Sequence, residues 1–181
     1  TILNRVHQIK GFIYTEVKIE ELPKLTITVK IESRKNSKGK CSVCGSRCPG
    51  YDRLPQRRFE FIPLWNIPVI LLYSLRRVSC KEHGIIVEQI PWAKGKEQTT
   101  TAFQIFLSQW ARLLSWKEVA LRFRTSWDVV YFSIKRVVDY GLEHRDLSGI
   151  ESVGVDEIAV WKGHKYATMV YQIDETNKRL L

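Results

Sequence analysis

The sequence predicts an α+β protein in which a β-rich module comes first, a helical module second and the start of another β unit third. Three observations predict this order. Apolar and polar residues alternate from Phe12 to Ile31, the apolar period becomes helical after a polar stretch at 91–98, and the strand pattern returns from Glu151. The predicted domains cover residues 1–92, 99–147 and 150–181.

The first module is expected to open with a β-hairpin and to contain two further strands. A short connection containing Pro23 separates the hairpin strands, and a turn at 63–68 with a proline at each end separates the other two. The stretch 91–98, which contains Pro, Gly and Lys, is expected to be a linker. The expected strands lie at 12–19, 25–31, 58–62 and 69–78.

Two pairs of metal-ligating residues in this module have the spacing of zinc ligands. Two residues separate Cys41 from Cys44 and also Cys80 from His83, and a glycine follows each pair. Three thiolates and one imidazole complete a tetrahedral site with no open position, which is typical of structural rather than catalytic zinc. The 35 residues at 45–79 have room for two strands. The sequence therefore predicts a zinc ribbon, and the alternative is a set of buried or adventitious cysteines.

Other residues of this module are open to two interpretations. Cys48 lies outside the paired spacing, so we expect a free thiol, although it could replace a ligand. Cations in the enclosed segment and near the second pair form either a phosphate-facing surface or a solvated strand face. The candidates for DNA contact are Arg53, Arg57 and Arg58, and the neighbouring cations are Arg76, Arg77 and Lys81.

The second module is expected to contain three helices, at 101–114, 116–123 and 127–141. Ser115 and Glu118 form a capping box at the start of the second helix. Ser126 is expected to cap the third helix, with Asp128 near its positive end. Two short helices joined by a three-residue turn, with the small Ala120 at their crossing, predict a helix-turn-helix.

The third of these helices has an apolar face and a polar face. Its apolar residues, expected to pack inward, are Val130, Ile134, Val137 and Val138. Its N-terminal part would enter the major groove of DNA. The candidates for DNA contact are Ser126, Trp127, Asp128, Tyr131, Lys135 and Arg136.

The alternative for this module is an ordinary helical hairpin that does not contact DNA. Arg124 stands at the turn, where a helix-turn-helix often has glycine. The aromatic side chains of Trp110, Trp116 and Phe132 are expected in the core rather than stacked on bases.

Positive charge is concentrated in the first two modules. The formal net charge of the chain is +10. Residues 1–150 carry 25 Lys and Arg against 14 Asp and Glu, whereas residues 151–181 carry 4 against 5. This asymmetry favours a polyanion-binding portion, and nucleic acid is the commonest such partner because Lys and Arg release counterions from its phosphates. A solvated basic surface that aids solubility is the alternative.

Composition argues against several classes of protein. With 44% hydrophobic and 27% charged residues, the chain can bury a core. No run approaches the roughly 18 apolar residues of a membrane span. The N-terminus lacks a secretory pattern, and four cysteines in 181 residues do not make a disulfide scaffold. We therefore expect no membrane partner and a cytoplasmic location.

The third module is expected to be a strand pair, 153–160 and 166–173, around a turn at 162–164. Its sequence strings, in succession with the earlier motifs, resemble a known family. The metal-ligand pairs are followed by Ser-Trp-Asp-Val-Val from Ser126, Gly-Val-Asp-Glu from Gly154 and Gly-His-Lys-Tyr-Ala-Thr from Gly163. This order resembles the ISL-three family of bacterial insertion-sequence transposases, from about Cys41 to the last residue, and 156–168 is the most specific part.

The resemblance implies an RNase H-like catalytic domain with three carboxylates, a DDE triad, holding two Mg²⁺ ions. Asp156 matches the first of them and would be a catalytic residue and a Mg²⁺ ligand, although an isolated Asp of this kind is usually structural. Two metals about 3.5–4 Å apart activate the attacking oxygen and stabilise the leaving oxygen. Glu157 would point to the opposite strand face, and Asp174 does not match the second triad position.

The resemblance also implies partners and a setting. The protein would bind the terminal inverted repeats of its element in double-stranded DNA, as a homodimer on paired ends, in the bacterial nucleoid. The sequence begins at Thr1 and ends at Leu181, before the family's second Asp and its Glu. We therefore expect the N-terminal portion of a transposase, inactive by itself because one carboxylate cannot hold two metal ions. A non-catalytic zinc-ribbon and helix-turn-helix transcriptional regulator is the alternative.

Overall fold

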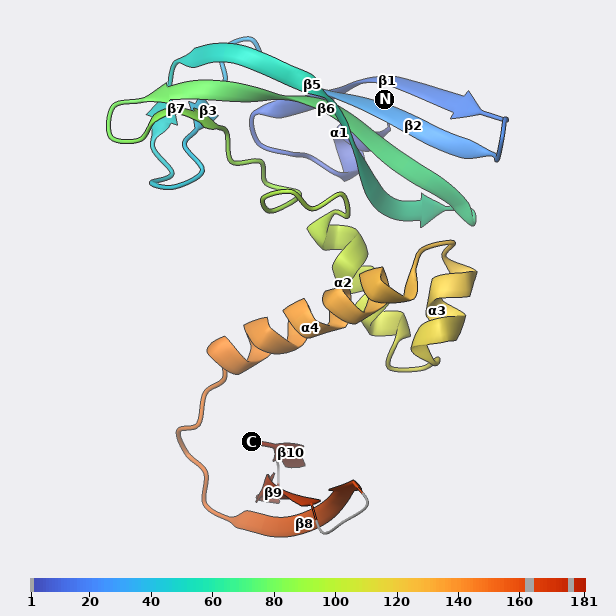
Figure 1. Cartoon of the computed structure of the whole chain (residues 1–181), viewed down its shortest axis with the longest axis vertical. Coiled ribbons are helices and arrows are strands. Elements are labelled where there is room, and N and C mark those ends of the chain that lie inside the picture. The colour runs from blue at the N-terminus through green and yellow to red at the C-terminus, as the bar shows by residue number, and fades with distance from the viewer. Residues whose placement is uncertain (1, 162–164, 176–177) are drawn as a thin grey trace. The chain divides into compact units, whose positions relative to one another are not determined.

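The computed structural model describes residues 2–161, 165–175 and 178–181, and it confirms a mixed, strand-rich α+β fold (Figure 1). The strands are β1 (Phe12–Glu20), β2 (Thr26–Ser33), β3 (Gly39–Lys40), β4 (Arg47–Cys48), β5 (Gly50–Leu64), β6 (Ile67–Cys80), β7 (Gly84–Val87), β8 (Val153–Trp161), β9 (Lys165–Ile173) and β10 (Lys178–Leu180). The helices are α1 (Leu3–Val6), α2 (Thr101–Trp110), α3 (Trp116–Arg122) and α4 (Trp127–Glu143). The chain divides into two compact units, Thr1–Val138 and Asp139–Leu181. The turn expected at 162–164 lies outside the described residues.

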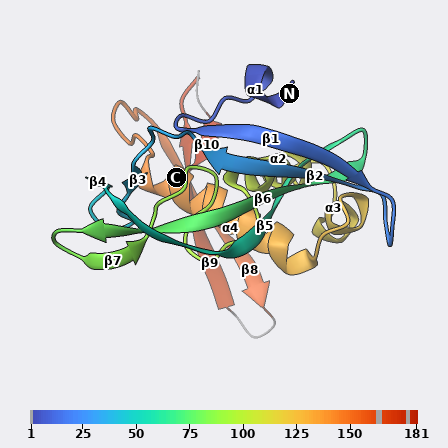
Figure 2. The same cartoon turned by 90° about the horizontal axis from the view of Figure 1, so that it is seen from above.

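The main sheet of the first unit has the strand order β1-β2-β6-β5, and β7 also pairs with β6. The expected hairpin of β1 and β2 is present, and β2 then runs parallel to β6. The expected strands at 58–62 and 69–78 are parts of the longer β5 and β6. Their ladder shifts register between Arg53 and Gln56, where Pro55 has no N–H to donate. Figure 2 shows these strands side by side, with β3 and β7 at one end of the sheet.

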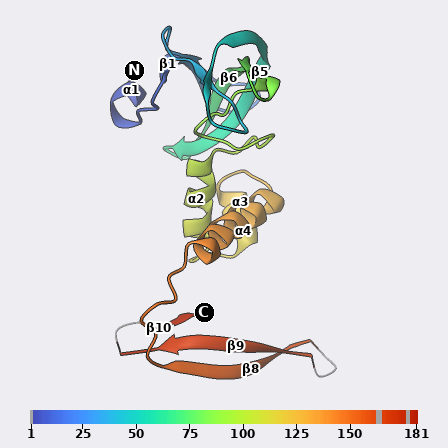
Figure 3. The same ribbon diagram turned by 90° about the vertical axis from the view of Figure 1, so that its left-hand side faces the viewer.

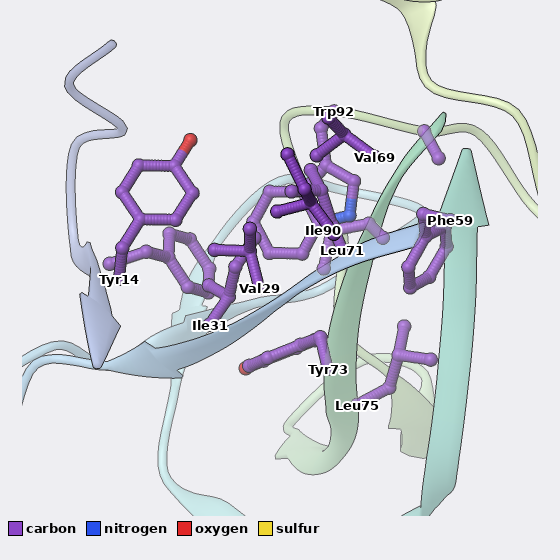
Figure 4. Close-up of a cluster of buried hydrophobic side chains, with 13 residues drawn as sticks. Tyr14, Val29, Ile31, Phe59, Val69, Leu71, Tyr73, Leu75, Ile90 and Trp92 are labelled. Atoms are coloured by element: carbon purple, nitrogen blue, oxygen red, sulfur yellow. The ribbon is translucent and has the colours of Figure 1, made fainter. Parts of the chain in front are cut away.

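One face of this sheet carries the main hydrophobic core (Figure 4). Alternate residues of β6 point into it, as the period of two in a strand requires. The indole of Trp92 lies at its centre and makes edge-to-face contacts with the rings of Phe12, Phe59 and Tyr73, at centroid distances of 4.9, 6.1 and 5.2 Å. Such aromatic contacts add to the free energy gained by burying the rings.

The segment 91–98 is therefore not the free linker that its composition predicts. Trp92 is buried in the main core. The guanidinium of Arg57 donates hydrogen bonds to the carbonyl oxygens of Gly95, at 3.2 Å, and Glu97, at 3.0 Å. The prediction rested on the polar residues of this segment. It did not take account of the large apolar surface of Trp92, whose burial holds the segment against the sheet.

A second core forms where α2, α3 and α4 pack together (Figure 3). Ile62 of β5 packs against it, and the backbone N–H of Thr100 donates to the carbonyl of Glu60 at 2.9 Å. These contacts place the first two predicted modules in one compact unit. The buried members of the second core are Phe103, Leu107, Val119, Ala120 and Val130.

Fewer apolar residues of α4 are buried than their helical spacing predicts. Val130 is buried and Ile134 packs partly against the second core, as expected. Val137 and Val138, however, are 39% and 50% exposed, because the second core involves only the first part of α4. Phe132, expected in the core, is 61% exposed.

The turn between α3 and α4 departs from right-handed backbone conformation at Arg124, whose φ is 54°. This is the position where the sequence lacks the usual glycine. The backbone N–H of Thr125 donates to the carbonyl of Ala120 at 3.0 Å and closes the end of α3.

The capping box at the start of α3 is confirmed. The Ser115 hydroxyl accepts from the Glu118 N–H at 3.3 Å, and the Glu118 carboxylate accepts from the Ser115 N–H at 3.0 Å. We expect Ser115→Ala to lower the free energy of unfolding by about 1 kcal/mol, because it leaves a helix N–H without its acceptor. Urea denaturation at pH 7 measures this loss. Lys117→Ala, at an exposed position of the same helix, is the control, and an equal loss in the control would contradict the capping role.

The second unit is a sheet with the strand order β10-β9-β8, all antiparallel, which Figure 3 shows as an extended strand pair with a short third strand. Most side chains on both faces of β8 are exposed. Among the helices of the described residues, none is both long and apolar enough to pass through a lipid bilayer.

Candidate metal centre and nucleic-acid interface

Two tight turns bring the four predicted metal ligands together at one end of the main sheet. Cys41 and Cys44 lie in the turn between β3 and β4, and Cys80 and His83 lie at the turn between β6 and β7. The glycine after each pair has a positive φ, 71° and 66°, which lets the backbone fold back without steric cost. One ligand atom from each of the four residues lies within 4.8 Å of all the others.

The spacing of these atoms matches a tetrahedral ion of the size of zinc. The Sγ atoms of Cys44 and Cys80 are 3.7 Å apart, and Nδ1 of His83 lies 3.5 Å from Cys80 Sγ and 3.8 Å from Cys41 Sγ. Zinc bonds of about 2.3 Å to sulfur and about 2.0–2.1 Å to nitrogen give tetrahedral edges of about 3.5–3.8 Å. The donor set and its dimensions therefore fit one metal ion, with His83 binding through Nδ1.

The electrostatics of the four residues favour the ligand form of Cys80. Its hydrogen bond with His83 lowers the pKa of the Cys80 thiol to about 6, and the same contact raises the pKa of His83. The hydroxyl and backbone of Ser46 lower the pKa of Cys44. Thiolate is the form of cysteine that binds metal ions.

Cys48 does not belong to this group, which agrees with the expectation of a free thiol. Its side chain is buried on β4 beside Val78. The thiol donates to the carbonyl of Ser46 at 3.4 Å. Burial raises the pKa of the Cys48 thiol and keeps it protonated.

A buried ion pair beside the metal-ligand turns was not predicted. The side chain of Glu88 has no exposed surface. Its carboxylate accepts from the Tyr73 hydroxyl at 2.6 Å, from the backbone N–H of Arg76 at 2.8 Å and from the Arg76 guanidinium at 2.7 and 2.8 Å. Glu88 also pairs with Cys41 as an isolated β-bridge. The signal in the sequence is a single acidic residue between the apolar residues of β7 and Ile90.

The three arginines predicted to contact DNA from β5 have different environments. Arg53 donates to the carbonyl of Ser74 at 3.2 Å and to the hydroxyl of Ser33 at 3.1 Å. Arg57 holds the 91–98 segment, so its guanidinium is engaged within the fold. Arg58 is exposed and has no hydrogen bond or ion pair with the described residues. Of these three, Arg58 is the most available to a ligand.

The N-terminal end of α4 presents a capped turn and a pair of aromatic rings. The Ser126 hydroxyl accepts from the backbone N–H of Val129 at 3.2 Å, as predicted for the cap. The indole of Trp127, 48% exposed, stacks on the Tyr131 ring with an interplanar angle of 6° and a centroid distance of 5.5 Å. Trp116 on α3 packs against both rings.

Beyond these rings, the predicted polar contacts of α4 separate into two sets. Asp128 and Lys135 are exposed. Arg136 instead faces the protein, where its guanidinium donates to the Glu97 carboxylate and to the Gln104 side chain, both at 2.6 Å. This ion pair connects α4 to the 91–98 segment and engages the Arg136 guanidinium within the fold, and contact of Arg136 with DNA stays a prediction.

In the second unit, Asp156 lies on β8 opposite Met169 of β9 and is exposed. Its carboxylate accepts from the backbone N–H of Glu157 at 2.8 Å. In the part of the chain that the structure describes, it belongs to no cluster of three or more metal-ligating side chains. Asp174 accepts from the N–H of Ser152 at 2.7 Å and so ties the strand ends together, which is a structural role.

Three curated proteins similar to this chain are transposases of insertion sequences. The transposase for insertion sequence element IS1001 of Bordetella parapertussis is 29% identical over 142 residues. The transposase for insertion sequence element IS1557, from two strains of Mycobacterium tuberculosis, is 28% identical over 144 residues. The curated relatives of this chain are thus named as transposases of two insertion-sequence elements, IS1001 and IS1557.

The transposase matches cover 78% of this chain but only 34% and 32% of the relatives. The chain thus spans about a third of the length of the curated relatives it matches. No protein-family profile matches the chain. No solved structure matches it either.

Proposed function

We propose that this chain is the DNA-recognition part of an insertion-sequence transposase of the ISL-three type, in which it binds the terminal inverted repeats of the element. The observation that carries the proposal is the similarity to insertion-sequence transposases over 78% of the chain. The concentration of positive charge in residues 1–150 supports it, since phosphate neutralisation drives DNA binding. The same similarity gives no support to the alternative of a transcriptional regulator.

Recognition is assigned to α3 and α4 acting as a helix-turn-helix. The exposed face at the start of α4, with Asp128 and Lys135 beside the stacked rings of Trp127 and Tyr131, is the surface that would enter the major groove. The cap at Ser126 fixes where this helix begins. Arg58 on β5 is a candidate for an additional phosphate contact.

Structural zinc is assigned to the β-rich end of the first unit. Cys41, Cys44, Cys80 and His83 have the donor types and distances that suit zinc, and four protein ligands leave no position open for chemistry. The ion would join two turns that the β-ladders alone hold by few hydrogen bonds, as in a zinc ribbon.

Catalysis is assigned to a complete transposase rather than to this chain alone. We propose that β8 and β9 are the first strands of an RNase H-like domain and that Asp156 is one of three carboxylates that hold Mg²⁺. Asp156 by itself does not make a two-metal site, because each ion needs several oxygen ligands. We further propose that two subunits act on paired element ends and that the protein associates with the bacterial nucleoid.

The test is binding to duplexes that carry the inverted repeats flanking the coding sequence. We expect the chain to bind these duplexes about a thousandfold or more tightly than shuffled ones at moderate salt. Lys135→Ala should weaken binding by about tenfold, because one groove or phosphate contact is lost. Fluorescence anisotropy measures both effects, and helical circular dichroism should be unchanged.

The matched control is Lys24→Ala, an exposed lysine in the β1–β2 connection. It removes the same charge outside the proposed interface, so we expect almost unchanged affinity. Full retention of affinity in Lys135→Ala would move recognition away from α4. Equal binding to the repeat and shuffled duplexes would contradict the proposed function.

A further inference from the structure

A basic cavity of about 790 Å³ lies in the first unit, beside the metal-ligand turns and away from α4. Its volume is within the range of ligand pockets. Its wall comes from the start of β1, the β2–β3 connection, β3, β4, β6 and the segment that follows β7. Five cationic residues line it beside the buried Arg76–Glu88 pair, and these five are Lys10, Arg34, Lys38, Lys40 and Arg47.

Backbone hydrogen bonds fold the β2–β3 connection, which forms part of the cavity wall. The N–H of Arg34 donates to the carbonyl of Gly11 at 2.9 Å, and the N–H of Ser37 donates to the carbonyl of Arg34 at 2.8 Å. The guanidinium of Arg76 donates to the carbonyl of Ser37 at 2.6 Å and anchors this turn to β6. Gly11 has a φ of 87°, a backbone conformation that strains any residue with a Cβ, so glycine suits this position in the cavity wall.

The five cations, which we call the cavity cations, lack compensation within the fold. None has an ion pair or hydrogen bond from its side chain to the described residues. The acidic residue in the wall, Glu88, is already neutralised by Arg76. Lys40 and Arg47 stand directly opposite each other on β3 and β4, where like charges are destabilising. A concave wall with charges of one sign concentrates the electrostatic field and attracts counter-ions.

We propose that this cavity binds the phosphodiester backbone of DNA and is a second contact region, separate from α4. The inference rests on the proposed function, because it assumes that DNA is the partner. The chemistry favours backbone over bases, since the cavity offers lysine and arginine groups and Phe12 in its wall is buried. Such contacts position a protein on DNA without reading sequence. The cavity would therefore add affinity, and α4 would add selectivity.

The test is a triple variant, Lys10→Gln, Arg34→Gln and Lys38→Gln, which removes three of the five cavity cations and none of the four candidate metal ligands. We expect it to weaken binding to repeat and shuffled duplexes by the same factor, about tenfold or more at low salt. The slope of log K against log salt concentration should become shallower by about 2.7, since each phosphate contact contributes about 0.9. Thermal unfolding and zinc content should match those of the unmodified chain, because the three side chains are exposed.

The matched control is Arg5→Gln, Lys24→Gln and Lys96→Gln, which removes the same charge at exposed positions outside the cavity. A control that loses as much affinity and salt dependence as the cavity variant would overturn the inference, because net charge alone would then explain binding. If the unmodified chain binds no duplex, the proposed function and this inference both fail. If it binds duplex and the cavity variant binds equally well, only the inference fails. Tripolyphosphate serves as the last probe, because it offers phosphate groups without a DNA duplex. If the unmodified chain binds tripolyphosphate, the cavity variant does not, and neither binds DNA, the proposed binding of the DNA backbone is contradicted.

Discussion

Glu88→Ala is expected to lower the free energy of unfolding by about 3–5 kcal/mol, because it removes one partner of a buried ion pair. The side chain of Glu88 is fully buried and that of Arg76 is only 11% exposed. The substitution leaves the guanidinium with one remaining acceptor, the Ser37 carbonyl, and leaves the Tyr73 hydroxyl without its acceptor. Leaving a largely buried charge and a buried hydroxyl without their partner is costly.

The measurement is urea denaturation with metal present, and the chain supplies a matched control. Asp52→Ala breaks a second Arg–carboxylate pair, with Arg77, whose side chains are 40% and 39% exposed. Surface pairs contribute about 0–1 kcal/mol, so the control should lose little. Glu88→Gln keeps the size of the side chain and should lose less than Glu88→Ala. Equal losses at Glu88 and Asp52 would contradict the structural role of the buried pair.

Cys80→Ser is expected to reduce the bound zinc from about one ion per chain to almost none. The Cys80 Sγ lies 3.7 Å from Cys44 Sγ and 3.5 Å from His83 Nδ1, so its loss removes one of the four ligands and both of these contacts. Metal binding free energy contributes directly to the stability of small metal-stapled modules. Cys80→Ser should therefore also melt at a lower temperature than the metal-loaded parent, and chelation should lower the melting temperature of the parent.

The control for this substitution is Cys48→Ala. Cys48 is buried in the same cluster of side chains but lies outside the four ligands. We expect it to retain its zinc, although loss of a buried sulfur lowers its stability. Emission spectrometry of the purified variants gives the metal content. Zinc loss in Cys48→Ala together with retention in Cys80→Ser would reassign the fourth ligand.

The features that the sequence predicted are those that depend on short-range patterns. The ligand pairs were found from spacing alone, because two residues between ligands define a tight turn whatever surrounds it. The capping box at Ser115 and the cap at Ser126 are equally local, and both are present. Strand and helix positions followed from apolar periodicity, although β5 is far longer than expected because Pro55 is accommodated at a register shift.

The features that could not be predicted depend on partners distant in sequence. β2 pairs with β6 in parallel, and no feature of the two sequence segments indicates that they are neighbours in the sheet. Trp92 lies in a polar stretch, and only the tertiary structure gives it three aromatic neighbours. Arg136 and Arg57 have the same charge as a DNA-contacting arginine, so only their hydrogen-bond partners reveal a structural role. Val137 and Val138 of α4 are a further example. Their helical spacing predicts burial, but both are exposed because the second core does not extend beyond Ile134 on this helix.

The proposed division of labour gives each part of the first unit one task. The metal centre would hold the turns at one end of the sheet, the buried Glu88–Arg76 pair would support the floor of the basic cavity, and α4 would read the groove. Because Arg76 also fixes the turn at Ser37, destabilising the buried pair should disturb the cavity as well.

The most direct test of DNA recognition by this chain is a salt titration of the zinc-loaded protein with a duplex that carries its inverted repeat. We expect tight binding at 50 mM salt and a loss of affinity of about 10³-fold or more at about 200 mM, as several phosphate contacts require. Absence of binding at the lower salt concentration, or an affinity that does not change with salt, would contradict DNA recognition by this chain.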